Sequence, residues 1–216
     1  LSDITISRIA AGEVLERPAS AIKELIENAL DAGATRIRVD IAQGGKSLIR
    51  VSDNGHGIAP EDLPLAIERH ATSKLDEEDI FDIHHFGFRG EALASIGAVA
   101  RLTLTSRAGT QEAWSISADS GQIYPPRPAA HPEGTTVEVR DLFHATPARL
   151  KFLGTDRAET QAISELVRRM ALGAPDVAFA LHDSTTGADR ILFAAHPETG
   201  DMLEKGRARA GRVPVS

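Results

Sequence analysis

Apolar residues recur at helical spacing in two long segments of the chain. Residues 19–30 carry Ile22, Leu25, Ile26 and Leu30 on one helical face. Pro18 precedes them and fits the first turn of a helix, while a glycine follows at position 33 as a natural stop. Residues 158–172 show the same periodicity, and shorter helices are predicted over 60–70 and 91–99.

Alternating polar and apolar residues predict the strands of a sheet. Residues 36–41 and 47–53 alternate in this way, and Gly44 and Gly45 between them are a hairpin signal. Further strands are expected over 102–106, 113–118 and 135–141, with a final hairpin formed by 177–181 and 190–193. The proline-rich stretch 124–132 is predicted to be a connection, and residues 1–16 either a short helix or an arm.

Two segments differ from this regular pattern. Residues 72–90 are rich in acidic side chains, lack strong periodicity and end in glycines, so we expect a long functional loop. From residue 200 onward the chain becomes basic and weakly periodic, like a linker or the clipped start of a second subdomain. The predicted organisation is one domain over residues 1–200, followed by such a segment over 201–216.

Composition narrows the class of protein. The 216 residues are 42% hydrophobic and 25% charged, the balance of a globular domain with a core. The net charge of −7 argues against a surface built to bind DNA along its whole length. The absence of cysteine excludes disulfides, thiolate metal sites and a cysteine nucleophile. We find no secretory signal and no apolar run of membrane-spanning length, and because the first residue is Leu1 we expect a trimmed start.

The first candidate site lies on the predicted helix 19–30. Glu24, Glu27, Asn28 and Asp31 are three or four residues apart and therefore share one face. A carboxylate such as Glu24 is a suitable general base, and the amide oxygen of Asn28 is a suitable Mg²⁺ ligand, which together would serve nucleotide hydrolysis. The alternative is an ordinary solvated polar face.

The second candidate is the segment from Asp53 to Ile58, which follows a predicted strand. An ionised carboxylate only accepts hydrogen bonds, so Asp53 could accept one from an adenine amino group. Gly55 and Gly57 would let the backbone approach a flat base closely. The alternative is a simple turn, since Asn-Gly is a strong turn signal.

The third candidate runs from Gly87 to Leu93, where a loop enters a helix. Backbone N–H groups at a helix N-terminus suit phosphate oxygens, and Arg89 adds positive charge. The P-loop signature is missing from the chain, and an ordinary helix entry is the alternative. The triplet Thr72, Ser73 and Lys74 offers hydroxyls and an ammonium group to phosphates. Thr136, in a predicted strand, could bind the base beside Asp53, or have no role beyond the strand.

Histidines give no metal signal. His70, His84 and His85 fit no ligand spacing and are predicted to be surface or packing residues.

The order of these motifs resembles the GHKL ATPase superfamily, which includes type II topoisomerases, heat-shock chaperones, histidine kinases and MutL. The amino-acid sequence of the motifs is most similar to the MutL DNA mismatch-repair family, over residues 9–193. The segments that carry this similarity are Ala10–Val14, Glu16–Pro18, Arg69–Lys74, Gly87–Ser95 and Asp141–Arg149. The resemblance implies an α+β fold: a two-layer α/β sandwich with a mixed, mostly antiparallel sheet and helices on one face.

The resemblance also implies roles for single residues. Glu24 is implied to be the general base for ATP hydrolysis and Asn28 the Mg²⁺ ligand. Asp53 is implied to read the adenine amino group, with Gly57 and Thr136 lining the base pocket. Residues 72–90 are implied to be an ATP lid. The residues implied to meet ribose or phosphates are Thr72, Ser73, Lys74, Gly87, Phe88, Arg89, Gly90, Glu91, Ala92 and Leu93.

The mechanism implied is an ATP-driven switch in a bacterial, cytoplasmic protein that joins the nucleoid during repair. ATP and Mg²⁺ order the lid, two N-terminal regions associate, and hydrolysis releases them, coupling mismatch recognition to downstream repair proteins. Family members have a second subdomain that supplies a lysine to the γ-phosphate and part of a DNA groove. The chain ends at Ser216, before that subdomain, so we expect weak turnover and weak or absent DNA contact.

Two other functions remain possible at this point. One is a nucleotide-binding interaction module without useful turnover, favoured by the length of the chain. The other is a topoisomerase or chaperone ATPase, which the amino-acid sequence of the segment 87–93 disfavours.

Overall fold

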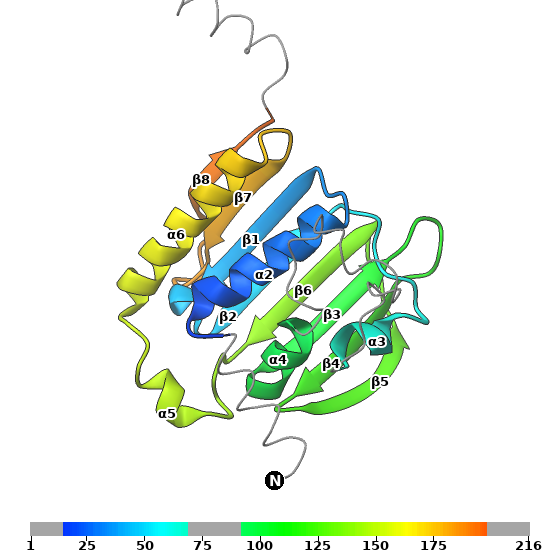
Figure 1. Ribbon diagram of the computed structural model, residues 1–216, viewed down its shortest axis with the longest axis horizontal. Coiled ribbons are helices and arrows are strands. Elements are labelled where there is room, and N and C mark those ends of the chain that lie inside the picture. Colours follow the sequence, from blue (N-terminus) through cyan, green and yellow to red (C-terminus); the bar gives the residue numbers. More distant parts are fainter. Residues whose placement is uncertain (1–14, 69–91, 198–216) are drawn as a thin grey trace, which may run out of the picture.

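One eight-stranded sheet and a layer of helices on one of its faces make up the molecule (Figure 1). The computed structural model describes residues 15–68 and 92–197. The strands lie in the order β5-β4-β3-β6-β2-β1-β7-β8, and β1 with β7 is the parallel pair in an otherwise antiparallel sheet. The expected two-layer α+β sandwich is therefore confirmed.

The strands are β1 (Arg36–Ala42), β2 (Leu48–Asp53), β3 (Arg101–Arg107), β4 (Trp114–Asp119), β5 (Gln122–Pro128), β6 (Gly134–Arg140), β7 (Ala178–Asp183) and β8 (Arg190–Ala195). The helices are α2 (Pro18–Asp31), α3 (Leu63–Ile67), α4 (Ala92–Val99), α5 (Pro147–Leu150) and α6 (Asp156–Gly173), with a 3-10 turn η1 (Gln43–Gly45) between β1 and β2. None of these described helices is both long and apolar enough to span a bilayer.

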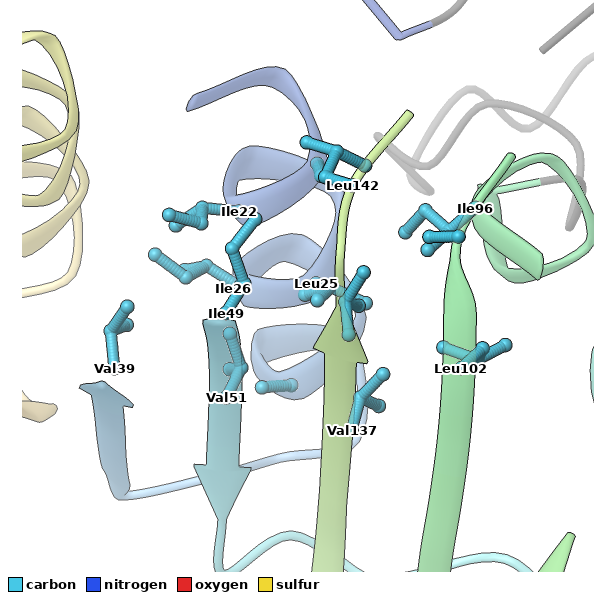
Figure 2. Close-up of a cluster of buried hydrophobic side chains, with 14 of the residues drawn as sticks. Ile22, Leu25, Ile26, Val39, Ile49, Val51, Ile96, Leu102, Val137 and Leu142 are labelled. Carbon is cyan, nitrogen blue, oxygen red and sulfur yellow. The ribbon is translucent and has the colours of Figure 1, made fainter. Parts of the chain in front are cut away.

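Helix α2 lies across the middle of the sheet and supplies much of the core. Its inward residues Ile22, Leu25 and Ile26 are at most 3% exposed. Figure 2 shows them above the inward side chains of β1, β2 and β6. Burial of such aliphatic side chains stabilises the fold by about 1.5–3 kcal/mol each. The polar face of α2 is consequently turned away from the sheet, and this face holds the candidate catalytic residues.

Two sequence predictions fail at prolines. The predicted helix over 60–70 shortens to α3, with Pro64 in its first turn, because proline is tolerated there but not in a helix interior. Residues 69 and 70 lie outside the described part. The predicted connection 124–132 contains most of β5, a strand whose three prolines are tolerated because it lies at the edge of the sheet.

The other predicted elements agree with the structure to within a few residues. The short helix α5 was not predicted. The predictions for the N-terminal arm, the lid over 72–90 and the segment after 200 fall outside the described residues, apart from positions 15 and 16.

Candidate active site

The polar face of α2 brings the first two predicted site residues together. Glu24 and Asn28 are one helical turn apart, and Asn28 is exposed. The side chain of Glu24 is only 16% exposed, and its carboxylate accepts no hydrogen bond from the described residues. The ammonium group of Lys23 lies 3.8 Å from Glu24 but is hydrogen-bonded at 2.6 Å to Glu27. Glu24 is thus a sheltered carboxylate that accepts no hydrogen bond within the part of the chain that the structure describes.

Burial raises the pKa of the Glu24 carboxyl. The positive charge of Lys23 opposes this effect, and the negative charge of Glu27 adds to it. A carboxylate with a raised pKa is a stronger base than an ordinary one. The local environment therefore suits proton abstraction.

The end of α2 is fixed to the loop that follows β2. The N–H of His56 donates to the carbonyl of Ala32 at 3.0 Å. The side chain of Asn54 accepts from the N–H groups of Thr35 and Arg36, where β1 begins. These bonds hold the segment after Asp53 against the end of the helix that carries Glu24 and Asn28.

Asp53 ends β2 in a mostly buried position. Its Oδ1 accepts the N–H of Gly55 at 2.8 Å. Burial raises the pKa of the Asp53 carboxyl, while the backbone N–H groups of Gly55 and Thr135 and nearby charge on His131 and His56 act in the opposite direction. The result is a carboxylate held in a fixed orientation at the end of the sheet.

Two glycines allow the backbone to close around this aspartate. A Cβ on Gly57 would lie 2.1 Å from the carbonyl oxygen of Arg107, and one on Gly134 would lie 2.2 Å from the carbonyl oxygen of Asp53. Both glycines have positive φ, 73° and 118°. A side chain on Gly57 would push its loop away from the end of β3, and one on Gly134 would separate β6 from β2.

The prediction for Thr136 needs correction. In the β2–β6 pairing Asp53 lies opposite Thr135, and Ser52 lies opposite Thr136. Directly paired residues share a face and successive residues alternate, so Thr136 lies on the other face of the sheet. Its hydroxyl donates to Ser52 at 2.9 Å rather than facing the aspartate. The threonine beside Asp53 is Thr135, which is 8% exposed.

Ser106 was not singled out from the sequence, yet it organises this corner. Its buried hydroxyl accepts the N–H of Ile58 at 2.8 Å and lies 2.8 Å from the hydroxyl of Thr135. It also donates to the carbonyl of Gly134 at 3.0 Å. The available signal was a serine at an inward position of a strand, in register with the buried Leu102 and Leu104.

The remaining predicted site residues fall into two groups. Ala92 and Leu93 begin α4, with Ala92 buried and Leu93 partly buried against the core. Helix α4 packs against α2, the helix that carries Glu24. The others lie outside the described residues, namely Thr72, Ser73, Lys74, Gly87, Phe88, Arg89, Gly90 and Glu91.

Comparison with known proteins decides the family. The family model described as histidine kinase-, DNA gyrase B-, and HSP90-like ATPase matches residues 16–127. The solved structure of the Aquifex aeolicus MutL ATPase domain complexed with ADP is 34% identical, with a TM-score of 0.72. That match covers 90% of this chain and 70% of the solved chain.

The chain belongs to the MutL family. It has the GHKL ATPase fold of that family's N-terminal domain. The DNA mismatch repair protein MutL of Rhodospirillum rubrum is 53% identical over 99% of this chain and 33% of its own length. The MutL protein of Azorhizobium caulinodans is 60% identical over 96% of this chain and 32% of its own length. The chain thus spans about a third of these relatives.

Away from the MutL-type site, one group of side chains in the described part has metal-ligand spacing. Asp40, His182 and Asp189 converge where β1 meets the β7–β8 hairpin. Arg38 already donates to both carboxylates, at 2.6 Å to Asp40 and 2.9 Å to Asp189. Because a guanidinium group neutralises this cluster, we assign it to holding the hairpin on the sheet rather than to a metal.

Proposed function

We propose that this MutL-family domain binds ATP with Mg²⁺ along α2 and hydrolyses it with Glu24 as the general base. The observation that carries the proposal is the connection between the two halves of the site. Glu24 and Asn28 lie on α2, and the end of that helix is bonded to the loop of Asp53. Glu24 is about 12 Å along the helix from Ala32, which leaves room for ribose and phosphates between base and carboxylate.

Glu24 would take the proton of the attacking water. Its partial burial raises the pKa of the carboxyl, and the raised pKa increases its basicity. The attacking oxygen then bonds to the γ-phosphorus as the bond to the bridging oxygen breaks, leaving ADP and phosphate.

Asn28 would hold Mg²⁺ through its amide oxygen. The donor fits, because Mg²⁺ prefers oxygen ligands and retains several waters, and the exposed amide of Asn28 has no hydrogen bond within the described residues. Bound Mg²⁺ would neutralise phosphate charge.

Asp53 would accept a hydrogen bond from the adenine amino group. Thr135 is on the same face and Ser106 fixes the surrounding backbone, so both support base recognition. The bound ADP in the Aquifex aeolicus MutL ATPase domain supports a nucleotide as the ligand.

The triphosphate would be enclosed by segments that lie outside the described residues, except for Ala92 and Leu93 at the start of α4. We assign Thr72, Ser73 and Lys74 to ribose or phosphate contacts. The backbone from Gly87 to Leu93 would wrap the phosphates, and residues 72–90 would form the lid.

The ATP-bound state would act as a switch. Closure around ATP would favour association of two N-terminal regions, and hydrolysis would release them, if the closed state binds ATP more tightly. In the whole protein this cycle would link mismatch-recognition proteins to downstream repair proteins in the bacterial cytoplasm, close to the nucleoid. The net charge of −7 leaves DNA contact weak or absent in this segment.

ATP affinity should fall at acidic pH because Asp53 must be ionised to accept the adenine amino group. Burial raises the pKa of Asp53 in the free protein, so the loss should begin at a higher pH than for an exposed aspartate. Below that pKa, affinity should decrease about tenfold per pH unit. Calorimetric titrations across the acidic range would measure this profile.

Asp53→Asn is the matched control. It should bind ATP more weakly at every pH and lack this step. The same step in Asp53→Asn would assign the titration to another group of the protein or to ATP itself, and contradict the role of Asp53.

A further inference from the structure

Two segments whose sequences match MutL motifs, 16–18 and 141–149, have no role in the site described above. The structure brings both to the beginning of α2. The carbonyl of Leu15, a residue with no exposed surface, accepts a hydrogen bond from Nη1 of Arg149 at 3.2 Å. The guanidinium group of Arg149 also lies 6.0 Å from the ring centre of the buried Phe143. The chain entering α2 is therefore anchored from outside the helix.

Arg17 provides a second anchor. It occupies the N-cap position of α2 with an extended backbone, but its side chain makes no capping bond. Instead Nε and Nη2 both donate to Oε2 of Glu159 on α6, at 3.1 and 3.0 Å. The other carboxylate oxygen, Oε1, accepts the N–H of Gly154 at 2.9 Å. Both oxygens of Glu159 are thus bonded.

Glu159 is itself held firmly. Its side chain is 3% exposed, and a Cβ on Gly44 would lie 2.9 Å from its Cβ, so helix and turn η1 are in close contact. Thr155 caps the helix by accepting the N–H of Ala158. Helices α2 and α6 lie side by side on the sheet (Figure 1). The ion pair therefore fixes the start of α2 to a rigid part of the fold.

We infer that Arg17 and Glu159 are positioning residues that set where Glu24 and Asn28 lie along the nucleotide. Arg17 precedes Glu24 by seven residues, which is about two helical turns and about 10 Å in total along the axis. A helix transmits an axial shift over that distance, and a displacement of about 1 Å at reacting groups costs on the order of 100-fold in rate. The inference rests on the proposed function of Glu24.

The test is steady-state hydrolysis and nucleotide binding by the full-length protein carrying Arg17→Ala or Glu159→Gln. We expect kcat to fall about tenfold or more in each and the Kd for ATP to change by a smaller factor, because Asp53, at the adenine end of the site, is also held by the pairing of β2 with β6. Arg17→Lys, which keeps the charge but loses the two-pronged contact, should recover part of kcat.

Asp156→Asn is the matched control, since Asp156 lies in the same first turn of α6 but pairs with Lys46 rather than with α2. It should keep the parent kcat. Folded Arg17→Ala protein with the parent kcat would overturn the inference. A second result would also overturn it: kcat, ATP affinity and the melting temperature all fall, and cooling restores kcat and the affinity. That pattern indicates a purely structural ion pair.

The failure of the proposed function is distinguishable in the same assay. If the Glu24→Ala variant hydrolyses ATP as well as the parent protein does, the role of Glu24 is refuted. The premise that Arg17 positions a base is then refuted as well. Parent activity that depends on Glu24 but not on Arg17 or Glu159 would overturn the positioning role alone.

Discussion

Replacing Glu24 with alanine should leave ATP binding nearly unchanged and lower phosphate release by about 10²–10⁴-fold, the usual contribution of a general base. The side chain is partly buried and accepts no hydrogen bond from the described residues, so its removal takes away a proton acceptor and, among these residues, breaks only the 3.8 Å ion pair with Lys23. Calorimetry would give the affinity, and a phosphate-release assay the rate.

Glu27→Gln provides a control on the same helical face, one turn further along. It removes a neighbouring negative charge and weakens the contact with Lys23, but should keep the rate within a few-fold of the parent. Equal phosphate release by Glu24→Ala and the parent would contradict the assigned role. If neither protein releases phosphate, the result would instead favour a nucleotide-binding module whose function does not depend on hydrolysis.

Replacing Gly134 with alanine should destabilise the domain by about 3 kcal/mol or more and abolish ATP binding. The added methyl group would lie 2.2 Å from the carbonyl oxygen of Asp53, and the backbone has a φ of 118° that other residues rarely adopt. Relief requires β2 and β6 to separate where they carry the site. The melting temperature should fall by roughly 10 °C for a domain of this size.

Gly173→Ala is the control for the loss of a glycine. It lies at the end of α6, where an added Cβ meets no atom of residues 15–68 or 92–197 within 4 Å, so stability should change by less than about 1 kcal/mol. If Gly134→Ala has the same melting temperature as Gly173→Ala and the parent, the tight approach of β6 to Asp53 is not a requirement of the fold.

The two long helices, α2 and α6, and most strands of this domain could be predicted because their residues follow one simple period. The inward face of α2 and the alternation along β1 and β2 depend only on local spacing. Strand β5 was missed because its prolines oppose a strand in general, and only its place at the edge of the sheet removes that objection. The order of strands and the parallel β1–β7 pair depend on contacts between distant residues.

The candidate site shows the same division. Glu24 and Asn28 could be paired from helical spacing alone, whereas choosing between Thr135 and Thr136 required the register of β6 against β2. A shift of one residue exchanges the two faces of a strand, and the sequence Gly-Thr-Thr is compatible with either choice. Ser106 and the pair of Arg17 with Glu159 act across separations of 28 or more residues, so no local pattern connects them.

The most direct test of the central claim is calorimetric titration of ATP, with and without Mg²⁺, into the parent chain and Asn28→Ala. We expect one binding site per chain in the parent, with tighter ATP binding in the presence of Mg²⁺ than in its absence. In Asn28→Ala the Mg²⁺-dependent part of the affinity should disappear while the melting temperature stays unchanged. The same Mg²⁺-dependent affinity in both proteins would contradict the placement of the ATP–Mg²⁺ site on the polar face of α2.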